Sequence, residues 1–416
     1  MKPTNSLKIA ASDIFKKSLN CVPYYFFLGN SSPWENEQEP PEAKNEVKTH
    51  IDVLNDVLCL KRINSEDLHT VIEDNTWISG KVYSQYDDEV DLDKPVDFYV
   101  INEEWGVYKC LDNNNYEVST VMPRGNLEKP FSCQDGYVWV YMYSVNKEDR
   151  RNFSGTGYIP CYDTVQMKEK WKNDGSIDRI DIVSGNENNC FKTSPKIIIK
   201  GDGYGCEAKA IIKDGKIEKV KIINPGKGYR RAFVEVQSNE CSCNTVMRPV
   251  VSPVGGHGYN PKEELHAIYK LLDIKLEGSK EGLPTGITYR RIGVVSKGLS
   301  NKKGCVVKVT CIRKIKRGQK LRTSSGEEIN VLMVDKDNSM FYTDSILSGF
   351  DTKIHGEGFT TEIINKINTE HLPLTEEVIN KGNYLKNSGN LLWFKNIKPV
   401  TRSEEKTEEY KFIVSF

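Results

Sequence analysis

The chain has 416 residues, with 58 Lys plus Arg and 58 Asp plus Glu, so its formal net charge at pH 7 is zero. A chain of this length allows about two to three domains. Proteins that bind nucleic acids usually carry a basic excess, because neutralising phosphates supplies most of their affinity. The balanced charge therefore argues against DNA or RNA as a partner, and little net repulsion opposes association with other proteins.

The N-terminal residues, MKPTNSLKIAASDIF, lack the unbroken apolar segment of a signal peptide. The most apolar early stretch, Val22–Leu28, is far too short to span a bilayer. We therefore expect a soluble protein that is made in a cytoplasm and has no membrane partner. The 11 cysteines are scattered, and an odd number in a long chain argues against a disulfide framework, so most should be reduced.

Short β-branched and aromatic runs between Gly, Asn and Asp clusters predict a mostly β protein with few helices. The first predicted helix has Val47, Ile51, Leu54 and Leu58 on one face. Clear strand candidates are Pro95–Val100, Tyr137–Ser144, Lys196–Ile199, Cys206–Ile212, Lys219–Ile223, Phe233–Val236, Cys305–Ile312, Asn330–Val334 and Tyr410–Phe416. Of these, Tyr137–Ser144 is aromatic or β-branched on both faces, which predicts a strand that is buried on both sides.

An acidic run comprises Asp87, Asp88, Glu89, Asp91, Asp93 and Asp97. It could bind calcium, but it lacks the sixth-position Gly and the terminal Glu of the helix-loop-helix calcium site. A solvated loop is the favoured interpretation.

A composition shift near Asp174 begins a hairpin-like segment. Asp214-Gly215 separates two alternating apolar strands, which predicts a two-residue turn because both positions need positive φ. We predict a small inserted β domain at residues 174–284, with one helix, inside a discontinuous frame domain formed by residues 1–173 and 285–416.

Four Gly-x-Gly-Tyr blocks could suggest phosphate-binding loops. They are Gly155–Tyr158, Gly201–Tyr204, Gly226–Tyr229 and Gly256–Tyr259. A phosphate loop needs a strand before the glycines and a helix directly after them, and these blocks lack that context. Turns in which the tyrosine ring covers the hairpin edge are favoured.

Cys241, Cys243 and His257 could provide three zinc ligands, but a second ordered pair is missing, so cysteines in a loop are favoured. After Pro261, the positions of Leu265, Ile268, Tyr269 and Leu272 predict the helix of the inserted domain.

The segment Lys302–Arg322 carries nine Lys or Arg residues, several of which alternate with apolar residues. This alternation predicts a strand with a basic outer face, which suits an acidic neighbouring protein better than nucleic acid. Ile363, Ile364 and Ile367 suggest a third helix. The apolar strand at the C-terminus, Tyr410–Phe416, must pair inside a sheet, because an exposed flat edge invites aggregation.

A catalytic set is hard to assemble from this sequence. The six histidines accompany neither a Gly-x-Ser-x-Gly nor a His-Glu-x-x-His motif. A triad that assembles in space stays open, because its members need not be close in sequence. We expect no enzymatic activity, no cofactor, no metal and no small-molecule substrate.

Five segments, taken in order, resemble the gene-product-eight baseplate wedge subunits of T4-like contractile-tailed bacteriophages. They are Tyr25-Phe-Phe-Leu-Gly-Asn-Ser-Ser-Pro-Trp34, Trp105-Gly-Val-Tyr-Lys-Cys-Leu-Asp112, Asp135-Gly-Tyr-Val-Trp-Val-Tyr141, Ser388-Gly-Asn-Leu-Leu-Trp-Phe-Lys-Asn396 and Phe412-Ile-Val-Ser-Phe416. Thr288–Val295 is a weaker match. The resemblance covers roughly residues 20 to 165 and 285 to 416, and the middle of the chain departs from it.

The resemblance implies a layered β-sandwich with an inserted domain, a homodimer, contacts with other wedge proteins and a place in the virion, at the tail baseplate. Its signature residues are Pro33, Trp34, Trp105, Tyr108, Gly136, Tyr137, Trp139, Gly389 and Phe416. Core packing is the favoured role for Trp34, Trp105 and Trp139, because tryptophan buries a large area. A receptor- or carbohydrate-binding tail module and a cell-wall hydrolase are the alternatives.

Overall fold

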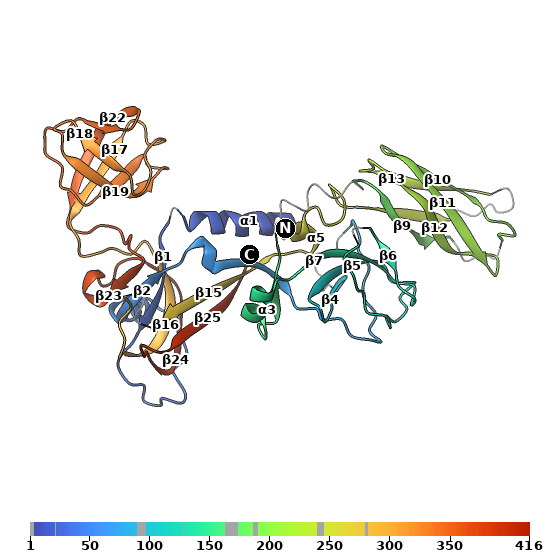
Figure 1. Ribbon diagram of the computed structural model, residues 1–416, viewed down its shortest axis with the longest axis horizontal. Coiled ribbons are helices and arrows are strands. Elements are labelled where there is room, and N and C mark those ends of the chain that lie inside the picture. The colour runs from blue at the N-terminus through green and yellow to red at the C-terminus, as the bar shows by residue number, and fades with distance from the viewer. Residues whose placement is uncertain are drawn as a thin grey trace. The chain divides into compact units, whose positions relative to one another are not determined.

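The computed structural model describes residues 4–20, 22–89, 97–127, 129–162, 174–185, 190–238, 245–278 and 282–416. The chain divides into two compact units, each built from segments that are distant in sequence. Unit 1 comprises Met1–Ser12, His69–Lys270 and Val414–Phe416, and unit 2 comprises Asp13–Leu68 and Leu271–Ile413. Strands dominate both units, which confirms the mostly β class with few helices (Figure 1).

Helices are short and few in the part of the chain that the structure describes. The α-helices are α1 (Asn5–Ser18), α2 (Val47–Asn55), α3 (Lys147–Phe153) and α5 (Pro261–Glu264), and the 3-10 turns are Ser65–Asp67 and Lys381–Asn383. Among the described residues, no helix has the length and apolarity needed to cross a membrane. The predicted helix at Val47 is present, although Leu58 belongs to the following strand.

Unit 1 contains a four-stranded antiparallel sheet in the order β4-β5-β7-β6. Its strands are β4 (Tyr99–Ile101), β5 (Gly106–Asp112), β6 (Phe131–Ser132) and β7 (Val138–Ser144). Successive side chains of β7 enter two different cores: Val140 and Met142 pack in one cluster, and Trp139 packs in the other. The predicted burial of this strand on both faces is therefore confirmed. Nearby, β3 (Leu68–Glu73) pairs with β8 (Tyr158–Pro160).

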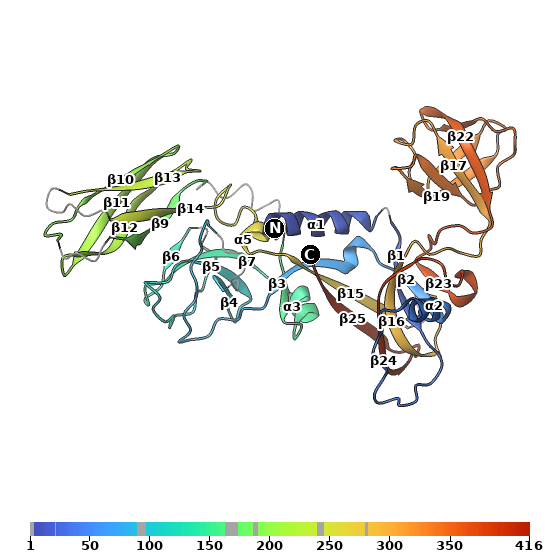
Figure 2. The same cartoon turned by 180° about the vertical axis from the view of Figure 1, so that it is seen from behind.

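The glycine-rich part of unit 1 forms a second four-stranded sheet, in the order β12-β11-β10-β13, and a two-stranded ribbon (Figure 2). The sheet contains β10 (Lys196–Gly201), β11 (Tyr204–Lys213), β12 (Lys216–Lys227) and β13 (Ala232–Gln237), and the ribbon contains β9 (Ile177–Ser184) and β14 (Val246–Val251). The predicted turn joins β11 to β12, with φ values of 50° at Asp214 and 76° at Gly215.

Unit 2 contains a five-stranded sheet in the order β23-β2-β1-β16-β24, with β15 and β25 side by side in another sheet. The strands are β1 (Tyr24–Gly29), β2 (Val57–Arg62), β15 (Tyr269–Glu277), β16 (Thr288–Ser296), β23 (Val378–Asn380), β24 (Asn390–Thr401) and β25 (Thr407–Ser415). The central strand β1 alternates between two cores, with Phe26 and Leu28 in one and Tyr25 and Phe27 in the other.

Six further strands of unit 2 close into a barrel in the order β17-β20-β19-β18-β21-β22, drawn in orange in Figure 1. They are β17 (Gly304–Val309), β18 (Lys320–Thr323), β19 (Glu328–Asp335), β20 (Met340–Thr343), β21 (Lys353–Gly356) and β22 (Phe359–Thr369). The barrel has a hydrophobic cluster of its own, which includes Val307, Ile329 and Phe341. Closure removes the free sheet edges that short strands would otherwise expose.

Two predicted helices are wrong. Leu272, Ile274 and Leu276 recur every second residue and pack in one core, so this segment forms β15, and only Pro261–Glu264 is helical. Ile363, Ile364 and Ile367 belong to β22, whose pairing with β17 and β21 closes the barrel. In both segments sheet pairing outweighs an apparent helical spacing.

The two compact units follow other boundaries than the predicted frame domain (residues 1–173 and 285–416) and inserted domain (residues 174–284). Strands β9–β14 lie in unit 1 together with the sheet around β5 and β7. The barrel is a further insertion, at residues 304–369 of unit 2, that no local pattern had separated from its surroundings.

Candidate functional site

Three of the signature aromatic residues lie together in unit 1. Tyr108, Tyr137 and Trp139 are fully buried in one cluster, and the Tyr137 and Trp139 rings stack with their centroids 5.5 Å apart. Tyr108 Oη donates to the Gly125 carbonyl at 2.6 Å, and Tyr137 Oη donates to the Glu117 carbonyl at 2.6 Å. These hydroxyls pin two loops onto the sheet, which is a packing role.

Two signature residues shape the turns beside this cluster. Trp105 adopts a positive φ of 63° and is half-buried against the neighbouring core. Gly136 has a φ of 84°, and a Cβ at this position would lie 2.6 Å from the side-chain nitrogen of Asn114. The positive φ therefore favours glycine at position 136, and a larger residue would also require the Asn114 side chain to shift.

In unit 2, Trp34 covers an exposed sheet edge. Its Nε1 donates to the carbonyl of Ile397 on β24 at 3.0 Å, and the guanidinium of Arg291 lies 5.6 Å from the centroid of the indole ring. Strand β24 is the last in its sheet, so this carbonyl has no strand partner on its outer side. Pro33 is exposed, and it precedes the anchoring ring directly.

An ion pair fixes the loop that carries Trp34. Arg290 Nε donates to the Glu37 carboxylate at 2.9 Å, its Nη2 donates to the same group at 2.8 Å, and its Nη1 donates to the Ser31 carbonyl at 3.0 Å. The hydrogen bond from Arg290 lowers the pKa of Glu37 below its ordinary value. Asn396 of β24 adds a hydrogen bond to the Pro41 carbonyl at 2.8 Å.

The last two signature residues lie elsewhere in the chain. Gly389 has a φ of 90°, and a Cβ there would lie 2.8 Å from the Ser296 carbonyl oxygen. Phe416 is half-buried at the end of the chain, directly after β25. The nine signature residues therefore do not form one site, and local packing or backbone geometry explains seven of them, all but Pro33 and Phe416.

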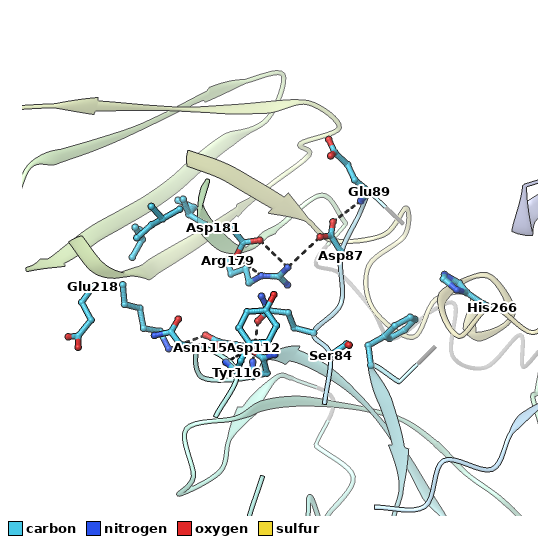
Figure 3. Close-up of a pocket in the computed structure, with 17 residues that line it drawn as sticks. Ser84, Asp87, Glu89, Asp112, Asn115, Tyr116, Arg179, Asp181, Glu218 and His266 are labelled. Carbon is cyan, nitrogen blue, oxygen red and sulfur yellow. Dashed lines mark hydrogen bonds and ion pairs between the residues drawn. The ribbon is translucent and has the colours of Figure 1, made fainter. Parts of the chain in front are cut away.

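Unit 1 contains a cavity of about 440 Å³, and Figure 3 shows its lining. Arg179 of β9 is at its centre, with its Nε and Nη2 on the two carboxylate oxygens of Asp181 at 2.8 and 3.1 Å. Its Nη1 donates to the carbonyls of Leu111, at 3.1 Å, and of Tyr86. On another wall, Lys219 pairs with Asp112 at 3.1 Å. Both cations of the lining are therefore paired, and the lining has more acidic than basic side chains: Asp87, Glu89, Asp112, Asp181 and Glu218 against Arg179 and Lys219.

The acidic run supplies further partners of this network. Arg248 of β14 donates to Asp87 at 2.6 Å and to Asp88 at 2.8 Å, and the Val251 amide donates to Asp88 at 3.0 Å. Burial raises the pKa of Asp88, although the amide and Arg248 oppose this shift. The first two carboxylates of the run thus bind an arginine. The sequence had suggested a solvated loop, or less favourably a calcium site, for this run. Asp91 and Asp93 lie outside the described residues.

A strained turn forms the rim of the same cavity. Asn114, Asn115 and Tyr116 have consecutive φ values of 53°, 59° and 63°. Left-handed backbone is unfavourable for residues with a Cβ, and here the Asn113 side chain supports it by accepting from the Tyr116 amide at 3.1 Å. Tyr116 is 72% exposed, so the turn presents an aromatic ring to solvent.

Unit 1 also contains a buried group of charged side chains. Lys109 of β5 pairs with Glu264 of α5, and His257 Nε2 lies 2.7 Å from the Asp178 carboxylate. Glu264 also accepts from the Gly258 amide at 2.9 Å. Burial would raise the pKa of Glu264, but the charges of Lys109 and His257 and the hydrogen bonds bring it below its ordinary value.

This arrangement superficially resembles a catalytic relay, but all four side chains are at most 5% exposed. A substrate therefore has no access to them, and their geometry fixes the loop around His257 onto β5 and β9. Of the considered zinc ligands, His257 is committed to Asp178, while Cys241 and Cys243 lie outside the described residues. Within the described ranges, no group of three or more His, Cys, Asp or Glu side chains is placed to hold a metal ion.

Three of the Gly-x-Gly-Tyr blocks contain turns or bends, as expected, whereas the block Gly226–Tyr229 begins in strand β12 and continues into a loop. Tyr229 is buried, and its ring lies where a Cβ of Gly203 would be, 2.4 Å from its Cγ. Tyr204 is exposed, with Lys227 Nζ 5.3 Å from its ring centroid. Of the cysteines, Cys190 is disulfide-bonded, and seven others are free: Cys59, Cys110, Cys133, Cys161, Cys206, Cys305 and Cys311.

The basic segment Lys302–Arg322 spans β17, a long loop and β18, with every Lys and Arg exposed. The predicted strand with a basic outer face is thus present only in part, because four of the basic residues lie in the loop: Arg313, Lys314, Lys316 and Arg317. This loop has no sequence signal of its own that separates it from the strands.

A scan against models of known protein families and a search of curated proteins found no match for this chain.

Proposed function

We propose that this chain is a structural subunit of the baseplate wedge of a contractile phage tail. It works by assembling with other wedge proteins and takes part in the rearrangement of the baseplate when the tail contracts. The observation that carries the proposal is the set of five segments that resemble the gene-product-eight family in the same order.

The positions of these segments support the proposal. The first contains β1, the central strand of its sheet, and the loop in which Trp34 covers the edge of β24. The second and third contribute the buried Tyr108 and Trp139. Residues that fix a scaffold in this way suit a protein whose function depends on its shape, because assembly needs rigid, complementary surfaces.

The proposal includes a homodimer, located in the virion at the tail baseplate and assembled in the host cytoplasm. Its partners are other wedge proteins, and it uses no nucleic acid, membrane or small-molecule substrate. The net charge of zero is compatible with association, because little electrostatic repulsion opposes contact with another protein.

An antibody raised against this chain tests the location. Purified virions of the phage that encodes it are labelled and imaged in negative stain, and label at the baseplate is expected. Label on the head, the tail sheath or the fibres would refute the proposal.

A receptor- or carbohydrate-binding tail module remains the alternative, and the exposed rings of Tyr116 and Tyr204 are the observation in its favour. A glycan array with the full-length chain separates the two functions. A scaffold gives no specific signal, whereas a binding module retains particular glycans and loses them in the variant Tyr116→Ala.

A further inference from the structure

A second cavity, of about 190 Å³, lies within unit 2 and is lined by four basic side chains. Arg62 comes from the end of β2, Lys316 and Arg317 come from the loop before β18, and Lys336 follows β19. The remaining lining residues that the structure describes are apolar or uncharged, and none of them is acidic.

The two arginines of this cavity converge on a single neutral acceptor. Arg62 Nη1 donates to the Thr375 carbonyl at 3.1 Å, and Arg317 Nη2 donates to the same oxygen at 2.7 Å. Arg62 is only 4% exposed. Burial and the nearby charge of Arg317 both lower the pKa of Arg62. The Thr375 carbonyl is a dipole without net charge, so it compensates two guanidinium ions poorly.

The two glutamates that follow Thr375 are engaged with other partners, and Asp335, which precedes Lys336, accepts from the Asn338 side chain at 2.8 Å. Glu376 pairs with Lys302, and the Glu377 carboxylate accepts from the side-chain Nδ2 of Asn64 at 3.0 Å. Glu377 acts on Arg62 through its charge but does not line the cavity. The cavity therefore keeps a surplus of positive charge.

We propose that this cavity binds a carboxylate side chain from an acidic segment of a neighbouring protein. A guanidinium group matches a carboxylate with two parallel hydrogen bonds, and two such groups are already held here by Thr375. Ile315 and Met333 add apolar walls that suit the methylene groups of a glutamate. The exposed basic residues around Arg313 continue the positive surface beyond the cavity, which favours a segment with several carboxylates over a single small anion. This inference rests on the proposed assembly role, since it names the chemistry of a partner.

The test measures binding of a fluorescent hexaglutamate peptide to the full-length chain. Fluorescence anisotropy reports the binding at low and at moderate salt. The variants Arg317→Gln and Lys336→Gln each remove one charge from the cavity. Lys353→Gln removes the same charge from an exposed site on β21 that does not line the cavity, so it controls for net charge. Lys336 has no part in the contacts to Thr375, so its variant keeps the test valid if Arg317→Gln disturbs folding.

We expect each cavity variant to weaken peptide binding about tenfold, because each loses a charge-assisted hydrogen bond. The control Lys353→Gln should weaken it less than about twofold, as expected for a screened surface charge. Equal losses in all three variants would show diffuse attraction and overturn the proposal. Binding of inorganic phosphate without binding of the peptide would overturn it in favour of a small-anion site, and absence of both would also refute it.

These outcomes are distinct from those for the assembly role. Baseplate label without peptide binding would reject the cavity proposal and leave the assembly role intact. Site-specific peptide binding by a chain that is absent from the baseplate would retain the cavity and reject the wedge location.

Discussion

Buried charges in unit 1 are stable only because each one has a specific partner. Lys109 is 0% exposed and Glu264 is 5% exposed, and they form an ion pair that amide groups complete. Desolvation of such a pair costs much of what the attraction returns, so the pair contributes little net stability as a whole. Removing one partner is different, because the remaining charge stays buried without compensation.

The variant Glu264→Gln should therefore lower the free energy of unfolding by about 3 to 5 kcal/mol, since it leaves Lys109 buried and unpaired. Its neighbour Glu263 bonds to the Ser6 hydroxyl at 2.8 Å in an exposed position, so Glu263→Gln is the matched control. This control should change stability by less than about 0.5 kcal/mol. Urea unfolding of both variants measures the difference, and equal losses would contradict a special role of the buried pair.

His266 predicts an acid-sensitive part of the stability. Burial, with the charge of Lys109, lowers the pKa of His266 from 6.5 to about 4. The unfolded chain thus takes up this proton at a higher pH than the folded chain. The stabilisation is complete above pH 6.5 and is lost as the pH falls towards 4, by about 3 kcal/mol at most.

The variant His266→Asn isolates this effect, because asparagine tolerates the positive φ of 52° at this position and does not titrate. Unfolding of both proteins is followed in urea between pH 7 and 4.5, where most carboxylates stay ionised. The stability of the variant should fall less steeply with decreasing pH. Parallel curves would show that another group causes the acid sensitivity.

At the scale of the elements, the sequence predicted those structures whose signals are local. Strands β7, β11 and β12 have clear alternation or aromatic content, and Asp214-Gly215 has the residues that its turn requires. Strand β15 was missed because its apolar residues also fit a helical spacing. The alternation at every second residue becomes evident only from the core in which these residues pack. Core packing was the role favoured for Trp139, and its side chain is 0% exposed.

The ion-pair networks could not be found in the same way. Asp87 and Arg248 are separated by 161 residues, and Arg62 and Thr375 by 313. No local spacing connects such residues, and both cavities depend on contacts of this kind. The basic surface of Lys302–Arg322 was visible in the sequence, but its convergence with Arg62 was not.

Trp34 gives a prediction for one element, the edge strand β24. The variant Trp34→Phe keeps an aromatic ring but loses the hydrogen bond to the Ile397 carbonyl and weakens the contact with Arg291. It should lower the free energy of unfolding by about 1 to 2 kcal/mol. Leu392→Ala, at a 53% exposed position of the same strand, is the control and should have almost no effect. Urea unfolding measures both effects. If Leu392→Ala destabilises the protein as much as Trp34→Phe does, Trp34 has no special role in covering the edge of β24.

At the scale of the whole molecule, two adjacent chain segments connect the barrel to the rest of unit 2. The Ser300 amide donates to the Leu372 carbonyl at 2.6 Å, and the Leu372 amide donates to the Lys302 carbonyl at 2.9 Å. The barrel also has its own hydrophobic cluster and no free sheet edge within it. These features are typical of an insertion that folds by itself, because few contacts cross its boundary.

A chain in which Asn-Gly replaces residues 303–370 should therefore fold, since a two-residue turn can join antiparallel segments that are already hydrogen-bonded. Its urea transition should stay cooperative, with a smaller slope because less surface is exposed on unfolding. The shortened chain lacks Arg317 and Lys336, so it should also lose hexaglutamate binding while it keeps the buried cluster around Trp139. An insoluble shortened chain, beside a soluble isolated barrel of residues 302–371, would show instead that unit 2 needs the barrel to fold.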